Sequence, residues 1–140
     1  MSELLPVVRQ VADLRSCITG WRSDGMSVGL VPTMGAMHDG HLSLVRASIK
    51  QNDRTCVSLF VNPKQFGEGE DFGTYPRDEA ADAAALAALS ADLMYAPAGD
   101  AMYPAGSVTA VSVPGLGDWL EGEFRPGFFT GVATVVTKLL

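Results

Sequence analysis

Continuous apolar runs recur along the first hundred residues of the chain. Residues 28–31, 55–61 and 93–96 each form such a run, which is typical of a strand buried in a parallel sheet. Proline has no backbone N–H and interrupts a hydrogen-bonded ladder, so we expect the first run to end at Pro32 and the third at Pro97. The pattern therefore predicts three buried strands.

Amphipathic stretches separate these runs. Apolar residues recur at helical spacing in residues 8–22 and again in residues 38–52, which predicts two helices. The second helix has a core-facing stripe consisting of Leu42, Val45 and Ile49. Residues 80–91 are rich in alanine, the best helix former, and follow Asp78, a favourable N-cap residue. We expect a third helix there, packed closely on the sheet.

This alternation of helices and strands predicts an α/β fold. The expected architecture is a Rossmann-like open parallel sheet of three or four strands, flanked by helices, in a single domain of residues 1–140. Residues 62–77 combine proline, glycine and acidic residues, which predicts a long loop of a kind that is often functional or mobile. Residues 108–113 alternate like a further strand, and residues 129–140 form an apolar helical pattern.

Composition and charge narrow the function classes. The net charge of −6, without a basic stripe, argues against nucleic acid as a partner. No apolar run is long enough to span a membrane. The two cysteines, Cys17 and Cys56, lie far apart in a chain without a recognisable signal peptide, so we expect free thiols and a cytoplasmic protein.

The candidate chemistry lies in residues 32–41, Pro-Thr-Met-Gly-Ala-Met-His-Asp-Gly-His, where the first strand gives way to a helix. The N-terminus of a helix offers unpaired N–H groups and a partial positive charge, which suit a phosphate. Gly35 permits close approach of backbone to a nucleotide, and Gly40 removes a side chain from the first helical turn. His38 and His41 are three residues apart and share one face, so both imidazoles can address the same phosphate.

Two other interpretations of the histidine pair are weaker. Two histidines in a loop are often merely solvated. A zinc site would need further ligands, but the chain has no other histidine, and Cys17 and Cys56 are distant in sequence. The position of the pair, at the carboxyl end of a predicted parallel strand, favours phosphate binding.

Three motifs in order carry a resemblance to a known family. The first is residues 32–45, the second is residues 60–66 running on to Tyr75-Pro76-Arg77, and the third is residues 120–127 with residues 131–136. Together they resemble the pantothenate synthetase (pantoate–β-alanine ligase) family of the nucleotidylyltransferase superfamily, over nearly the whole chain.

The resemblance implies a two-step reaction. ATP and pantoate would give pantoyl adenylate and pyrophosphate, and β-alanine would then attack to release pantothenate and AMP. It implies ATP as a substrate that brings Mg²⁺ with it, no metal held by the protein alone, and a homodimer. His41 is expected to donate a proton to the phosphates with His38 as its partner. The expected ATP-binding residues are Met34, Gly35, Ala36, Met37, His38, Asp39, Gly40 and His41.

The resemblance also places pantoate and β-alanine against Gln65. A glutamine amide both donates and accepts hydrogen bonds, which suits a carboxylate and hydroxyls, although a loop-bracing role explains a lone glutamine equally well. The other expected contacts are Asn62, Met34, Val132 and Val136. An apolar wall for the dimethyl carbon, or ordinary core packing, is expected of Phe60, Phe66, Val132, Val135 and Val136. We interpret Glu68, Glu70 and Asp71 as a solvated acidic loop rather than a metal site.

The sequence departs from the family pattern at two places. Phe128 stands where most members have histidine, and a phenyl ring offers no polar contact to pantoate there. The family also continues with a Gly-x-Lys-Asp-x-Gln-Gln stretch, a Met-Ser-x-Arg-Asn loop and a small C-terminal domain. The chain is therefore expected to correspond to the N-terminal half, a nucleotide-binding domain incomplete at its C-terminal end, and to lack synthetase activity alone. The alternatives are another adenylyl- or cytidylyltransferase and a non-catalytic nucleotide-binding fragment.

Overall fold

A computed structural model describes residues 4–140, which form two compact units. The first comprises the chain up to Phe60 together with Pro76–Ala101, and we call it the sheet unit. The second comprises Val61–Tyr75 and Met102–Leu140, and we call it the helical unit. Each unit is described by itself below.

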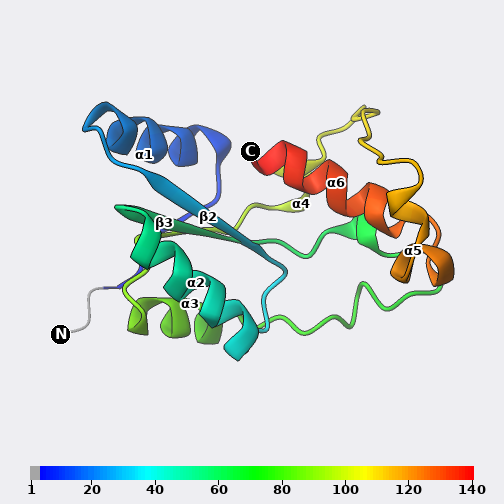
Figure 1. Ribbon diagram of the computed structural model, residues 1–140, viewed down its shortest axis with the longest axis horizontal. Coiled ribbons are helices and arrows are strands. Elements are labelled where there is room, and N and C mark those ends of the chain that lie inside the picture. Colours follow the sequence, from blue (N-terminus) through cyan, green and yellow to red (C-terminus); the bar gives the residue numbers. More distant parts are fainter. Residues whose placement is uncertain (1–3) are drawn as a thin grey trace. The chain divides into compact units, whose positions relative to one another are not determined.

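The sheet unit contains a four-stranded parallel sheet, which confirms the predicted α/β fold (Figure 1). Its strands are β1 (Val7–Val8), β2 (Val28–Thr33), β3 (Arg54–Leu59) and β4 (Leu93–Tyr95), in the order β1-β4-β3-β2. The short strand β1 was not expected, because Val8 was placed in the first helix. Val8 instead lies opposite Tyr95 in the parallel ladder.

Three helices flank this sheet. They are α1 (Val11–Ser23), α2 (Asp39–Gln51) and α3 (Glu79–Ala88), close to the predicted ranges. Figure 1 shows α1 on one face of the sheet and α2 and α3 on the other. As predicted, Asp78 is the N-cap of α3, where its side chain accepts a hydrogen bond from the Ala81 backbone N–H at 3.0 Å.

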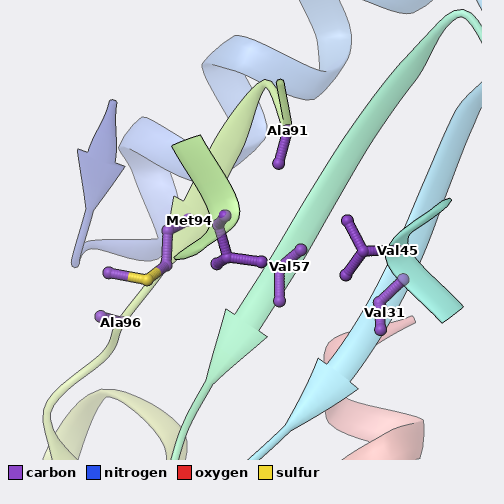
Figure 2. Packing of buried hydrophobic residues seen from close by; sticks show 7 residues of the cluster. Val31, Val45, Val57, Ala91, Met94 and Ala96 are labelled. Atoms are coloured by element: carbon purple, nitrogen blue, oxygen red, sulfur yellow. The ribbon is translucent and has the colours of Figure 1, made fainter. Parts of the chain in front are cut away.

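The core of the sheet unit lies between the sheet and α2 and α3. It consists of Val31, Val45, Val57, Leu86, Ala91, Met94 and Ala96. Figure 2 shows Val45 of α2 next to Val31 and Val57 on the neighbouring strands β2 and β3. Leu42 and Ile49 pack against this cluster, so the predicted core-facing stripe of α2 is confirmed. Full burial of one such aliphatic side chain stabilises the fold by about 1.5–3 kcal/mol.

Pro32 does not end the first long strand, contrary to the prediction. It lies within β2 opposite Ser58, and the strand continues to Thr33. The reason is that β2 is at the edge of the sheet, where alternate backbone groups face away from the ladder and need no partner strand. Thr33, whose backbone oxygen accepts from the Phe60 N–H at 3.1 Å, resumes the pairing with the chain that follows β3.

The helical unit consists of short helical segments and one longer helix. These are η1 (Pro63–Gln65), η2 (Leu116–Asp118), α5 (Glu121–Phe124) and the predicted C-terminal helix α6 (Phe128–Leu139). A further short helix, α4 (Gly99–Met102), lies where the chain passes from one unit to the next. Within residues 4–140, no helix combines the length and the apolar character needed to cross a bilayer.

Residues 108–113 form no strand, which corrects the prediction made from their alternating pattern. The helical unit as described contains no strand with which they could pair. Their backbone bonds to a helix side chain instead, because the Val111 N–H donates to Oγ1 of Thr134 at 2.9 Å. Val108 at 92% exposed has no buried face to occupy, so the alternation does not reflect a half-buried strand.

Candidate functional site

The two histidines form the cap of helix α2. His38 is the N-cap, and its Nδ1 accepts a hydrogen bond from the Gly40 backbone N–H at 3.1 Å. His41, at the third helical position, accepts the His38 backbone N–H through its own Nδ1 at 3.3 Å. This is a reciprocal capping box built from two imidazoles, in which each ring satisfies an otherwise unpaired N–H of the first turn.

The capping bonds determine what the rings can offer to a ligand. Because each Nδ1 acts as an acceptor, the neutral form of each ring carries its proton on Nε2. The two ring centroids lie 4.0 Å apart with planes tilted by 36°, so the rings form one small surface. His38 is exposed and His41 is partly buried. The pair therefore provides two neighbouring Nε2–H donors, as an oxygen-rich anion requires.

In the protein without a bound ligand, His41 favours its neutral form. Burial lowers the pKa of His41, and repulsion from His38 lowers it further, while the carboxylate of Asp82 acts in the opposite direction. Burial is the largest of these causes. A bound anion would oppose these effects and favour the imidazolium.

Asp82 of α3 holds the turn that precedes the histidines. Its side chain is 4% exposed, and its two oxygens accept hydrogen bonds from the Ala36 N–H at 3.0 Å and the Met37 N–H at 2.8 Å. Sequence reasoning missed this residue. One signal was available: Asp82 lies four positions before the core residue Leu86, so a carboxylate occupies the buried face of an alanine-rich helix.

The glycines of the turn are required by its geometry. Gly35 has a φ of +85°, and a Cβ there would lie 3.0 Å from an Asp82 oxygen. A Cβ at Gly40 would lie 2.8 Å from Cε1 of His38, so Gly40 leaves room for the capping ring. Ala36 adopts the left-handed region at φ +52°, a conformation that costs about 1 kcal/mol for a residue with a side chain. The two Asp82 bonds on either side of it stabilise this conformation.

In the helical unit, Asn62 and Gln65 are joined directly. Nδ2 of Asn62 donates to Oε1 of Gln65 at 2.9 Å and to the Gly131 carbonyl at 3.0 Å. Oδ1 of Asn62 accepts from the Lys64 N–H at 3.2 Å and from the Tyr103 hydroxyl at 2.7 Å. Asn62 is 1% exposed, and all four of its hydrogen-bonding positions are occupied by protein. Gln65 is only partly buried and lines a cavity of about 160 Å³.

Arg125 also lines this cavity. It pairs with Glu70, which lowers the pKa of that carboxyl, and it donates to the Gln65 carbonyl at 2.6 Å. Its guanidinium also lies 4.4 Å from the centre of the Phe128 ring, a cation–π contact. The Phe128 ring thus supports the Arg125 guanidinium. Glu70 is exposed, as expected of a solvated acidic loop, and also forms this ion pair.

The remaining candidates divide between the units. Met34 is partly buried and Asp39 is exposed, both in the sheet unit, which also holds the buried Phe60. In the helical unit, the α6 residues Val132 and Val136 are partly buried and Val135 is buried. Phe66 packs edge to face against two aromatic rings, Phe72 and Tyr75. Among residues 4–140, no three His, Cys, Asp or Glu side chains group closely enough to hold a metal ion.

Comparison with known proteins decides the family. The sequence model of pantoate–β-alanine ligase matches residues 6–140, nearly the whole chain. The chain belongs to the pantoate–β-alanine ligase family. Among its relatives, the pantothenate synthetase of Chelativorans sp. (strain BNC1) is 58% identical over 136 residues, which cover 97% of this chain and 48% of the relative. That of Rhodospirillum rubrum is 56% identical over 135 residues, 96% of this chain and 48% of the relative.

Solved structures of ligases in this family share the fold. The pantothenate synthetase of Thermus thermophilus gives a TM-score of 0.87 at 45% identity, covering 96% of this chain and 48% of that one. The pantoate–β-alanine ligase of Francisella tularensis, solved in complex with β,γ-ATP and β-alanine, gives 0.89 at 37% identity, covering 97% and 52%. The chain thus spans about half the length of the relatives it matches.

Proposed function

We propose that this chain carries the nucleotide-binding part of an ATP-dependent ligase that joins pantoate to β-alanine through a pantoyl adenylate. The observation that carries the proposal is the histidine cap of α2. It places two Nε2–H donors at the N-terminus of a thirteen-residue helix that follows the carboxyl end of strand β2. Membership of the ligase family supports the choice of reaction.

The geometry suits the first step of that reaction. Attack of a pantoate carboxylate oxygen on the α-phosphorus would break the bond to the leaving pyrophosphate, on which negative charge accumulates. Donors fixed in advance toward that charge stabilise the transition state. His41 would become protonated when ATP binds and would give a charge-assisted hydrogen bond to the phosphates, with His38 beside it. Met34, Gly35 and Gly40 would supply backbone contacts to the nucleotide, and Ala36, Met37 and Asp39 would lie beside it.

Mg²⁺ in this proposal arrives with ATP. It prefers to keep several waters and to be held by phosphate oxygens together with one or two carboxylates. Gln65 would bind pantoate oxygens, and Val132 and Val136 would line an apolar surface for its methyl groups. β-Alanine would follow once the adenylate has formed. Asn62 would contribute to the pantoate site through its hydrogen bond to Gln65.

A pantoate-dependent ATP–pyrophosphate exchange assay tests the proposal, because the first step is reversible and needs no β-alanine. We expect exchange with pantoate and none without it. Exchange that depends on a phosphorylated acceptor instead would identify another nucleotidylyltransferase. Binding of ATP without exchange in the complete polypeptide would reduce the chain to a nucleotide-binding module.

We propose a cytoplasmic homodimer that uses the small molecules ATP, pantoate and β-alanine. Sedimentation velocity of the complete polypeptide would measure its mass, and a monomer at micromolar concentration would overturn the dimer.

A further inference from the structure

The orientation of the Asn62 amide is set by two backbone groups. The Lys64 N–H can only donate, so the Asn62 atom 3.2 Å from it must be the oxygen. The Gly131 carbonyl can only accept, so the atom 3.0 Å from it must be the nitrogen. These two contacts distinguish the amide oxygen from the nitrogen without reference to any other side chain.

This orientation dictates that of Gln65. The second N–H of Asn62 Nδ2 points to the Gln65 amide at 2.9 Å, which must therefore present its oxygen. The Gln65 nitrogen, with two N–H groups, is left for the cavity that Gln65 lines. Toward a ligand, Gln65 then offers two N–H donors, while its oxygen already accepts one hydrogen bond from Asn62.

Tyr103 completes the arrangement from a distant part of the sequence. Its hydroxyl donates to Oδ1 of Asn62 at 2.7 Å, and burial raises the pKa of Tyr103, so the proton stays on the phenol. Close packing fixes the frame around it. A Cβ at Gly131 would overlap the Lys64 carbonyl oxygen, so helix α6 lies directly against η1.

We propose that Tyr103 is a positioning residue which, through Asn62, holds the Gln65 amide with its N–H groups toward the substrate. The group that these N–H donors bind is then an acceptor oxygen, a carboxylate or hydroxyl of pantoate, since an ammonium has no lone pair to accept them. This inference rests on the proposed function for the identity of the substrate. The hydrogen-bond arrangement itself stands independently of it.

The first experiment compares Tyr103→Phe with Thr137→Val in the complete polypeptide. Both substitutions remove one hydroxyl, and Thr137 is an exposed α6 residue whose hydroxyl bonds only within its own helix. Titration calorimetry should show pantoate binding weakened about 3- to 10-fold by Tyr103→Phe, the equivalent of one hydrogen bond, with ATP binding unchanged. Thr137→Val should leave both affinities as they are. Equal pantoate affinity in the two variants, or equal losses for pantoate and ATP in Tyr103→Phe, would overturn the proposal.

A second measurement needs no substrate. In the wild type, the side-chain amide protons of Asn62 should exchange slowly with water by NMR, and Tyr103→Phe should accelerate that exchange at least 10-fold. Unchanged exchange would overturn the positioning role even if the enzyme is active. If the wild type binds no pantoate while the exchange rates change as expected, the proposed function fails and the positioning role stands. If Tyr103→Phe does not fold, fast exchange in the folded wild type would by itself overturn the arrangement.

Discussion

Nδ1 of His41 accepts the backbone N–H of His38 at 3.3 Å, so the residue that we propose to act on phosphate also caps helix α2. The bond fixes the His41 ring and leaves Nε2–H as its outward donor. The structural role and the proposed chemical role therefore belong to the same side chain. Any substitution of His41 changes both unless the capping function is restored.

Comparison of His41→Ala with His41→Gln separates the two roles. Glutamine is a usual capping-box residue at this position and can accept the His38 N–H, whereas alanine cannot. We expect His41→Ala to lower the free energy of unfolding by about 0.5–1 kcal/mol and His41→Gln to leave it nearly unchanged, as measured by urea denaturation. Both should reduce pantoate-dependent ATP–pyrophosphate exchange by a factor on the order of 10² or more.

Comparison of the two variants separates the loss of the cap from the loss of the imidazole. If His41→Gln retained exchange within a few-fold of the wild type, the imidazole would have no catalytic role. If His41→Ala alone lost exchange, the loss would be due to the cap rather than to the chemistry.

The stability that His41 contributes should depend on pH. Burial lowers the pKa of His41 below its usual 6.5 in the free protein, so the folded state disfavours the charged form. Since the unfolded chain then binds the proton more readily, the stability contributed by neutral His41 is fully present above pH 6.5. It is lost as the pH falls through the lowered pKa.

NMR titration can follow the protonation of His41, and its dependence on ATP, in the His38→Asn variant. Asparagine is a favourable N-cap, and the chain has only two histidines, so the remaining imidazole signal belongs to His41. We expect a midpoint below 6.5 without ligand and a higher midpoint with ATP, because the triphosphate favours the imidazolium. A midpoint unaffected by ATP would place the nucleotide away from His41.

The sequence predicted those parts of the molecule whose pattern is local. The strand, glycine turn and helix of residues 28–51 follow from apolar periodicity, whereas the capping bonds of the two histidines were not predicted. The partners of Ala36 and Asn62 could not be predicted, because Asp82 and Tyr103 lie 46 and 41 positions away and only the folded chain brings them together. The prediction that Pro32 ends its strand was wrong because a strand at the edge of a sheet tolerates a proline. The position of β2 in the sheet could not be predicted from the proline itself.

The two cysteines should differ in reactivity. Cys56 lies in β3 with 2% of its surface exposed, and burial raises the pKa of its thiol to about 12. Only the thiolate reacts rapidly, so Cys56 should resist iodoacetamide at pH 8 in the native state. Cys17 is only half-buried and should be alkylated first. Peptide mapping after partial alkylation measures the order, and equal labelling of both in the folded protein would contradict it.

Gln65→Glu should weaken pantoate binding more than Gln65→Ala. Glutamate keeps an oxygen for the Asn62 N–H but replaces the outward N–H groups with a negative oxygen, which repels a carboxylate. Loss of the donor alone costs roughly 1–3 kcal/mol, and ATP affinity should change far less in either variant. Equal losses for pantoate and ATP would make Gln65 a brace for the loop, and unimpaired pantoate binding by Gln65→Glu would place no carboxylate there.

Asp82→Asn should loosen the turn that carries the histidines. The carboxylate accepts two backbone N–H groups, one through each oxygen, at 3.0 and 2.8 Å. Asparagine has a single acceptor oxygen, so its NH₂ group would face an N–H of Ala36 or Met37, leaving that donor unsatisfied. The expected loss is about 1–3 kcal/mol in the free energy of unfolding, because the site is buried. ATP affinity should fall as well, since Ala36 is no longer held in its left-handed conformation.

Asp78→Asn on the same helix provides the matched control. Asp78 also accepts a backbone N–H, but as an exposed N-cap, where asparagine performs as well as aspartate. Both variants remove one negative charge from the first turn of α3, so any general effect of that charge on the helix or on ATP appears in both. The difference between the two variants then reports the loss of one of the two acceptor oxygens of the buried Asp82. Urea denaturation and ATP titration should therefore separate the two variants clearly. If they lose equal stability and equal affinity, Asp82 does not hold the turn, and the histidines owe their placement to helix α2 alone.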